Sequence, residues 1–151
     1  MKIEYAILAD AAQAVGGKIF ILGGGWNVFR AANYPAPVQL AIAAGFAFAG
    51  GEVGRQYPLK IVIADETGTA IVPELSGQID TGQLAPEVPQ GLPIKIPMAW
   101  NVNFAVPRPG RYQIIISIGS SSAELSFDAI IVGRKLQFSP ESSKSPVERG
   151  N

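Results

Sequence analysis

The side chains best suited to proton transfer and metal binding are missing from this chain. It has no histidine and no cysteine, so the commonest general base, the commonest metal ligand and all thiolates are absent. A Ser-His-Asp triad, a thiol nucleophile and a sulfur-ligated metal site are therefore excluded. Any acid–base chemistry would have to come from carboxylates alone.

The carboxylates do not form a catalytic pattern in the sequence. Asp65 and Glu66 are adjacent in a turn and point in different directions, and Asp10, Asp80 and Asp128 are scattered along the chain. Two carboxylates at the separation used by glycosidases would be needed for a hydrolase, which is the weakest of three hypotheses. No segment has the spaced Asp and Asn residues of a calcium loop. We expect no enzymatic activity, no metal and no cofactor.

Three consecutive glycines, Gly23 to Gly25, follow a predicted strand as a phosphate-binding loop would. A Lys-Ser or Lys-Thr pair does not follow them, and the next segment resembles a strand. Without a helix N-terminus the loop lacks the aligned N–H groups that bind an anion. The glycines therefore predict a hairpin turn.

Trp26 follows these glycines at a hairpin mouth, with Asn27 and Arg30 close by. An exposed tryptophan beside polar groups is typical of a stacking platform, which makes this group a candidate contact surface. It supports the second hypothesis, a small-ligand or glycan-binding module. Trp100, by contrast, belongs to the apolar phase of its strand, so we expect it in the core.

The segment Val38–Phe48 has an unusual second face. Its even-numbered residues are large and apolar, whereas its odd-numbered residues include Ala41, Ala43, Gly45 and Ala47. A soluble sheet usually presents polar side chains to water, so this smooth strip must be covered by the chain's own loops or by another subunit. The low charged fraction of 16% favours a homo-oligomer.

The elements that must position these residues are strands. From Ile94 to Val106 every even-numbered side chain is apolar and the odd-numbered ones are mostly polar or small, which is the period of a strand. Similar alternation and turn residues predict eight further strands: Ile3–Ala9, Lys18–Leu22, Trp26–Arg30, Val38–Phe48, Tyr57–Ala64, Thr69–Leu75, Tyr112–Ile118 and Leu125–Ile131. We expect Asp10 to cap a single helical turn over Ala11–Val15, and Gly77–Gly91 to form the longest loop.

About nine short strands separated by turns predict one all-β domain, a single antiparallel two-sheet β-sandwich over residues 1–134, with a barrel as the alternative. Residues 135–151 are rich in Ser, Pro and charges and are expected to form a flexible tail. The run from Pro109 to Tyr112 resembles the Pro-Gly-x-Tyr entry to a late strand in immunoglobulin-like sandwiches. In those domains the phenol bonds a nearby backbone group.

Charge and hydropathy narrow the choice of partner. Twelve basic and twelve acidic residues balance, so no overall field would attract nucleic acid or an anionic membrane. The N-terminus lacks the pattern of a secretory signal, and the longest apolar run, Val38–Gly51, is too short for a membrane span. We expect a cytoplasmic protein.

The opening Glu4-Tyr5-Ala6-Ile7-Leu8-Ala9-Asp10, followed by residues 17–24 (GKIFILGG), resembles the start of a bacterial family of uncharacterised small β-sandwich proteins. Residues 107–112 are similar to a later element of that family, and the resemblance extends to about Val132. It implies an all-β domain and no established activity. The main hypothesis is therefore a non-catalytic β-sandwich that acts through protein–protein contacts, as a homo-oligomer or an accessory subunit.

Overall fold

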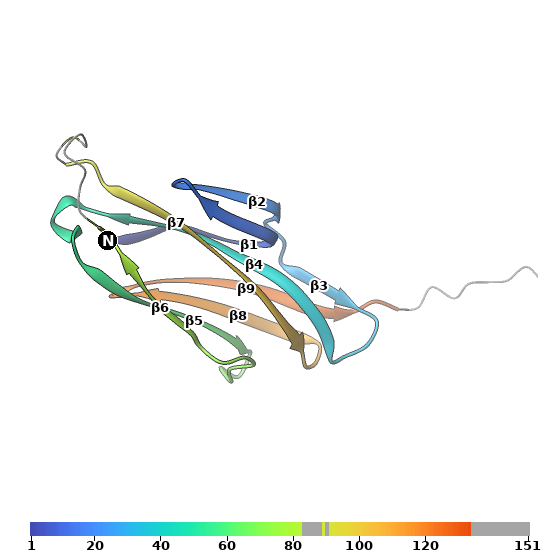
Figure 1. Cartoon of the computed structure of the whole chain (residues 1–151). Coiled ribbons are helices and arrows are strands. Elements are labelled where there is room, and N and C mark those ends of the chain that lie inside the picture. The colour runs from blue at the N-terminus through green and yellow to red at the C-terminus, as the bar shows by residue number, and fades with distance from the viewer. Residues whose placement is uncertain (83–88, 90, 134–151) are drawn as a thin grey trace, which may run out of the picture.

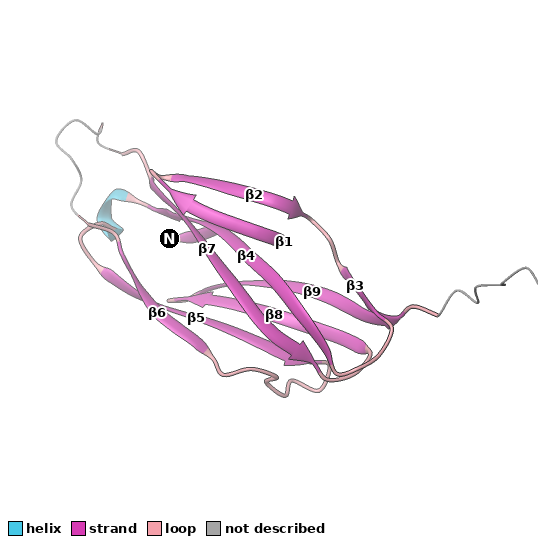
Figure 2. Ribbon diagram, turned by 45° about the vertical axis from the view of Figure 1, so that its right-hand side comes forward, coloured by secondary structure: helices cyan, strands magenta, loops and turns pink. Residues whose placement is uncertain are grey.

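A computed structural model describes residues 1–82, 89 and 91–133, and in this part of the chain nine strands form two sheets (Figures 1 and 2). The strands are β1 (Lys2–Val15), β2 (Lys18–Gly24), β3 (Val28–Ala31), β4 (Ala36–Phe48), β5 (Gln56–Asp65), β6 (Leu75–Asp80), β7 (Ile94–Val106), β8 (Gly110–Ile118) and β9 (Ser121–Ile131). A single 3-10 turn, η1 (Gly50–Glu52), is the one helical element described. Within these ranges no helix has the length and apolar character needed to cross a membrane.

The two sheets lie as two layers, with orders β2-β1-β4-β7 and β3-β9-β8-β5-β6 (Figure 2). The prediction of an all-β domain with about nine strands is confirmed. The prediction that every strand pair is antiparallel is wrong in one place, because β3 pairs with β9 in parallel. The loop of residues 32–35 returns β3 to the first sheet, and it contains a cis peptide bond between Tyr34 and Pro35.

The core lies between the two layers and is built by alternation. The predicted strand Ile94–Val106 is observed with the same bounds and pairs along its whole length with β4. The even-numbered residues of β4 point into the core, where they meet the isoleucines of β5 and β8 and Phe127 of β9. Trp100 packs against this core as expected, with its ring edge-on to Phe46 at 6.4 Å between ring centroids.

The predicted helical turn after Asp10 is wrong, because β1 continues through Ala11–Val15 to the end of the strand. Gly16 and Gly17 have φ values of +59° and +71°, the left-handed pair that a two-residue hairpin turn requires. This turn lets Ala11 to Val15 pair with β2. Backbone pairing with a neighbouring strand thus replaces the local hydrogen bonds that a capped helical turn would offer.

The segment after the Asp65 turn also differs from expectation. Of the predicted strand Thr69–Leu75, only the isolated bridge of Ala70 to Ala64 and the last residue, Leu75, are observed in β-structure. The next strand is β6, which occupies part of the predicted loop Gly77–Gly91. It forms there because Ile79 is buried in the core while its neighbours pair with β5. Residues 83–88 and 90 of that loop, and the predicted tail at 135–151, lie outside the described residues.

Candidate functional site

The smooth strip on β4 is not a surface of the folded chain. Ala41, Ala43, Gly45 and Ala47 are all buried within the single chain. Of the two explanations offered by the sequence, cover by the chain itself is the one observed. The prediction that these four residues form a binding surface is therefore wrong, because they face an inner layer of the molecule.

The cover comes from the β1–β2 hairpin, residues 10–24, which folds across the outer face of β4 and β7 (Figure 1). Ala12 of the hairpin packs in one cluster with Ala41 and Ala43. The side chain of Asn101 on β7 bonds the hairpin backbone twice. Its Nδ2 donates to the Ala12 carbonyl at 2.9 Å, and its Oδ1 accepts from the Ala12 N–H at 3.2 Å. The Asn101 amide thus bonds the backbone N–H and C=O of Ala12, as a neighbouring strand would otherwise do.

The rest of the strip is covered by side chains of β1 and β7. The ring of Tyr5 lies on Gly45, and a Cβ at that position would come within 2.2 Å of the ring. Glycine is therefore required there by the close approach of the aromatic ring. Next to Ala47 in the register, Lys2 and Lys95 both pair with the carboxylate of Glu4, at 3.9 and 3.1 Å.

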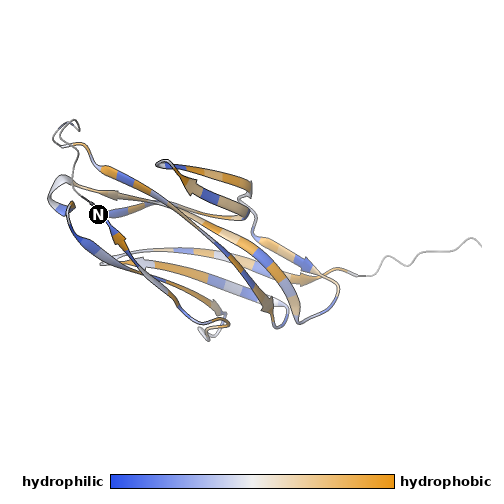
Figure 3. Cartoon of the chain, in the orientation of Figure 1, coloured by the Kyte–Doolittle hydropathy of each residue, from blue (hydrophilic) through white to orange (hydrophobic). Residues whose placement is uncertain are grey.

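While one side of the hairpin covers the sheet, its other side leaves apolar groups in water. Phe20 and Leu22 on β2 are 56% and 72% exposed, and Val15 before the turn is 54% exposed. Figure 3 shows the apolar character of this projecting element. The two β2 side chains border an open recess of about 670 Å³ whose other lining residues include Gln13 and Asn101. The hairpin is therefore the candidate functional site.

The sequence contained a signal for this site that the strand prediction did not use. Residues 19–22 (IFIL) are apolar without alternation, so at least one large side chain must point away from whichever face β2 buries. The predicted strand Lys18–Leu22 is confirmed as part of β2, and Phe20 and Leu22 lie on its second, exposed apolar face. An edge strand with two apolar faces has to leave one of them exposed.

The Trp26 group is only partly brought together. Trp26 and Arg30 line a recess of about 450 Å³ that also contains Asp10 and Gln39, whereas Asn27 is exposed and is not among the lining residues. Trp26 also packs edge-on against Phe127, with 6.0 Å between ring centroids. Its indole nitrogen is buried and finds no hydrogen-bond partner in the described part of the chain.

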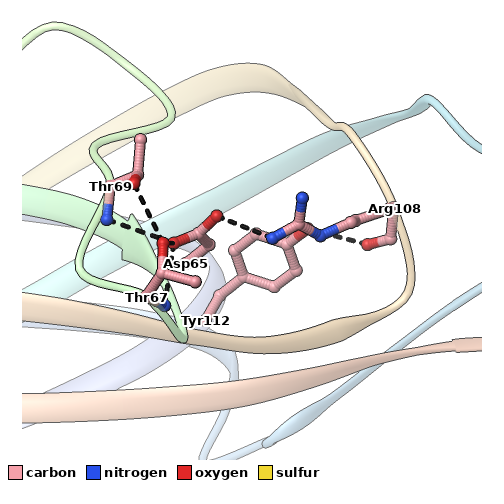
Figure 4. A network of polar contacts seen from close by, with 5 residues as sticks. All are labelled: Asp65, Thr67, Thr69, Arg108 and Tyr112. Atoms are coloured by element: carbon pink, nitrogen blue, oxygen red, sulfur yellow. Dashed lines mark hydrogen bonds and ion pairs between the residues drawn. The ribbon is translucent and has the colours of Figure 1, made fainter.

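The carboxylate of Asp65 is held in a structural network at the end of β5 (Figure 4). It accepts bonds from the hydroxyl and the N–H of Thr67, from the N–H of Thr69 and from the guanidinium of Arg108 at 2.9 Å. The hydroxyl of Tyr112 donates to the Arg108 carbonyl at 2.7 Å, the corner bond that the Pro-Gly-x-Tyr run suggested. The Thr67 hydroxyl bond is the largest of the effects that lower the pKa of Asp65, with the two amides and Arg108 acting in the same direction.

The lowered pKa of Asp65 predicts a pH dependence of stability. Because the folded state favours the ionised form, the contribution of Asp65 is complete above the ordinary carboxyl pKa of about 4 and is lost as pH falls towards the lowered folded pKa. We expect Asp65→Asn to unfold at lower urea concentration than the parent protein at pH 7, with a difference that shrinks below about pH 4. Urea midpoints at pH 3 to 7 measure this. The exposed Glu124→Gln is the control, and a pH-independent difference for Asp65→Asn would contradict the assignment.

Two of the other candidate carboxylates, Asp128 and Asp80, are also engaged in local bonds. Asp128 takes two bonds from the Arg111 guanidinium, at 2.9 and 3.1 Å, and this bond lowers the pKa of Asp128. Asp80 accepts from the N–H of Gly82 at 2.8 Å, a bond that likewise lowers the pKa of Asp80. Among the described residues, acidic side chains do not gather in groups of three or more that could hold a metal.

The fold and the site define a small all-β protein whose most unusual surface is an apolar hairpin. The model of the Family of unknown function (DUF6941) matches residues 4–127, so the chain belongs to that family. The match starts at β1 and ends within β9, and it contains the whole β1–β2 hairpin. No curated protein matches the sequence.

Proposed function

We propose that this protein is a non-catalytic β-sandwich that acts through contact with other protein chains, using the β1–β2 hairpin as its contact surface. The observation that carries the proposal is the exposure of Phe20 and Leu22, at 56% and 72%, on a projecting element. Large apolar side chains grouped on an element that stands out from the molecule are typical of protein–protein contact sites.

The architecture supports the scaffold part of the proposal. Residues of both sheets contribute to one core cluster, as the two layers of a sandwich do. The bond from Tyr112 to the Arg108 carbonyl matches the tyrosine corner of immunoglobulin-like domains. Such domains hold contact elements on a rigid frame and serve many unrelated functions, so the function must come from the surface.

The chemistry of the described residues supports the non-catalytic part. Asp65 and Asp128 are each bonded to an arginine and have lowered pKa values, which suits permanent charge better than proton transfer. The balanced charge of the sequence, with twelve basic and twelve acidic residues, gives no overall attraction to nucleic acid. The hairpin instead offers apolar area, which favours a protein partner.

Site-specific photo-crosslinking in the cells that produce the protein tests this proposal. A benzoylphenylalanine in place of Leu22 should yield covalent adducts with protein on irradiation. The same probe in place of Ser126, an exposed residue of β9, should yield few or none. An absence of adducts from position 22, or equal yields from both positions, would overturn the proposal.

Small-ligand or glycan binding at Trp26 has less support. The recess there contains a carboxylate, a guanidinium and an amide beside the indole, a combination suited to hydroxyl groups. However, Trp26 packs against Phe127 and the core, and its N–H is already buried. The indole therefore contributes to packing at this site, and the hairpin is the better candidate.

A further inference from the structure

The free edges of the two sheets differ in how they resist pairing with another strand. An edge strand presents unpaired N–H and C=O groups, and proteins protect such edges with charges, proline, bulges or short length. The strand orders place β2 and β7 at the edges of one sheet, and β3 and β6 at the edges of the other. These four edges can be compared directly.

Three of the four edges carry protection. On β7, Pro97 lacks an N–H and the polar residues Lys95 and Asn103 are exposed. The edge strand β6 has six residues, and exposed Gln78 and Asp80 give it polar character. The edge strand β3 has only four residues. Each of these features discourages an incoming strand.

The edge of β2 lacks this protection over most of its length. Its seven residues contain one charge, Lys18, at the first position, and no proline. No described strand lies on its outer side. The middle of the strand is Phe20, Ile21 and Leu22, all exposed to between 36% and 72%. This edge therefore combines free backbone groups with apolar side chains, as strand-addition sites do.

We propose that two copies of this chain pair along β2, antiparallel and about a two-fold axis at Ile21, so that their four-stranded sheets form one continuous sheet. This inference rests on the proposed function and names its partner. Backbone pairing between identical edges is isologous, the commonest form of protein dimer.

The sequence of β2 complements itself in this register. With Ile21 opposite its copy, Phe20 lies opposite Leu22, and Lys18 comes to the Gly23–Gly24 end of the second copy, where the positive φ of Gly23, +62°, ends the regular extended run. The carboxylate of Asp10 lies against Gly23 of its own hairpin, because a Cβ on Gly23 would come within 2.1 Å of Asp10 Oδ2. In the proposed dimer, Lys18 of each copy therefore lies at the end of the other copy's hairpin where Asp10 is placed. No like charges of β2 oppose each other.

The chain itself offers a clean chemical test, because it contains no cysteine. Directly opposed residues of an antiparallel pair have Cα atoms about 4.5–5.5 Å apart, within the range of a disulfide. We expect Ile21→Cys to form a disulfide-linked dimer under mild oxidation, at low protein concentration. The matched control Ser126→Cys should remain monomeric.

Mass measurement provides the second arm. Light scattering and sedimentation over a concentration series should give twice the chain mass of 15.9 kDa for the parent protein. Leu22→Lys should raise the dimer dissociation constant by roughly tenfold or more, because a charge would replace an apolar contact with Phe20 of the second copy. Ser126→Lys should leave it unchanged, and circular dichroism confirms that each variant is folded.

The outcomes separate this inference from the proposed function. A monomer at every concentration together with no disulfide from Ile21→Cys would overturn self-pairing. So would a dimer that Leu22→Lys does not weaken, because another surface would then hold it. If crosslinks from position 22 still reach other proteins in either case, the proposed function stands with a different partner. If position 22 yields no adducts, both are wrong.

Discussion

Replacing Ala43 with glutamate is expected to remove most of the stability of the fold. Ala43 has no exposed surface and lies beneath the hairpin in a layer of alanines, so a carboxylate there would be buried without a partner. The effective cost of burying an unpaired charge is several kcal/mol, against a total stability of about 5–15 kcal/mol for a typical domain. Urea denaturation followed by circular dichroism measures the loss.

The matched control for this prediction is Ala105→Glu. Ala105 is an exposed alanine on the neighbouring strand β7, and a glutamate there would remain in water. We expect its stability to lie within about 0.5 kcal/mol of the parent protein. If the two variants were equally stable, the hairpin would not cover β4 as described, and the strip would be an outer surface.

The second large effect is expected from a comparison of two phenylalanines, Phe46 in the core and Phe20 on the surface of the hairpin. Phe46→Ala should lower the free energy of unfolding by about 3–5 kcal/mol, because Phe46 is 1% exposed and would leave a cavity beside Trp100. Phe20→Ala should change monomer stability by less than about 1 kcal/mol, because that ring is 56% exposed. Urea midpoints at a concentration that keeps both variants monomeric measure these values. Equal losses would contradict the assignment of Phe20 to a contact surface.

The sequence predicts those parts of the fold whose side chains alternate between a buried and an exposed face. The strand Ile94–Val106 is observed with the predicted bounds because a one-residue shift would bury Lys95 and the asparagines. The strand after Asp10 was missed because alanines fit a helical turn and a strand equally well, and the choice was made by pairing with β2.

The candidate site could be predicted only in part, because it depends on which face of each strand is covered. Alternation placed Ala41 and Ala43 on one face of β4, but the residues that cover that face come from the hairpin and from Asn101. Nothing in the spacing of an asparagine indicates that its amide will bond a strand 89 positions away. Because the hairpin covers this face of β4 and is held there by Asn101, the exposed apolar surface lies on β2 and not on β4.

The parallel pairing of β3 with β9 has a consequence for how the chain reaches this structure during synthesis. Val28 pairs with Asp128, so the two partners lie 128 − 28 = 100 positions apart. A ribosome adding about 5–20 residues per second takes at least several seconds to make the intervening chain. During that interval β3 has been synthesised but its partner β9 has not, whereas both strands of the β1–β2 hairpin are already present. The β1–β2 hairpin can therefore form early, whereas the second sheet is completed only when the end of the domain has emerged.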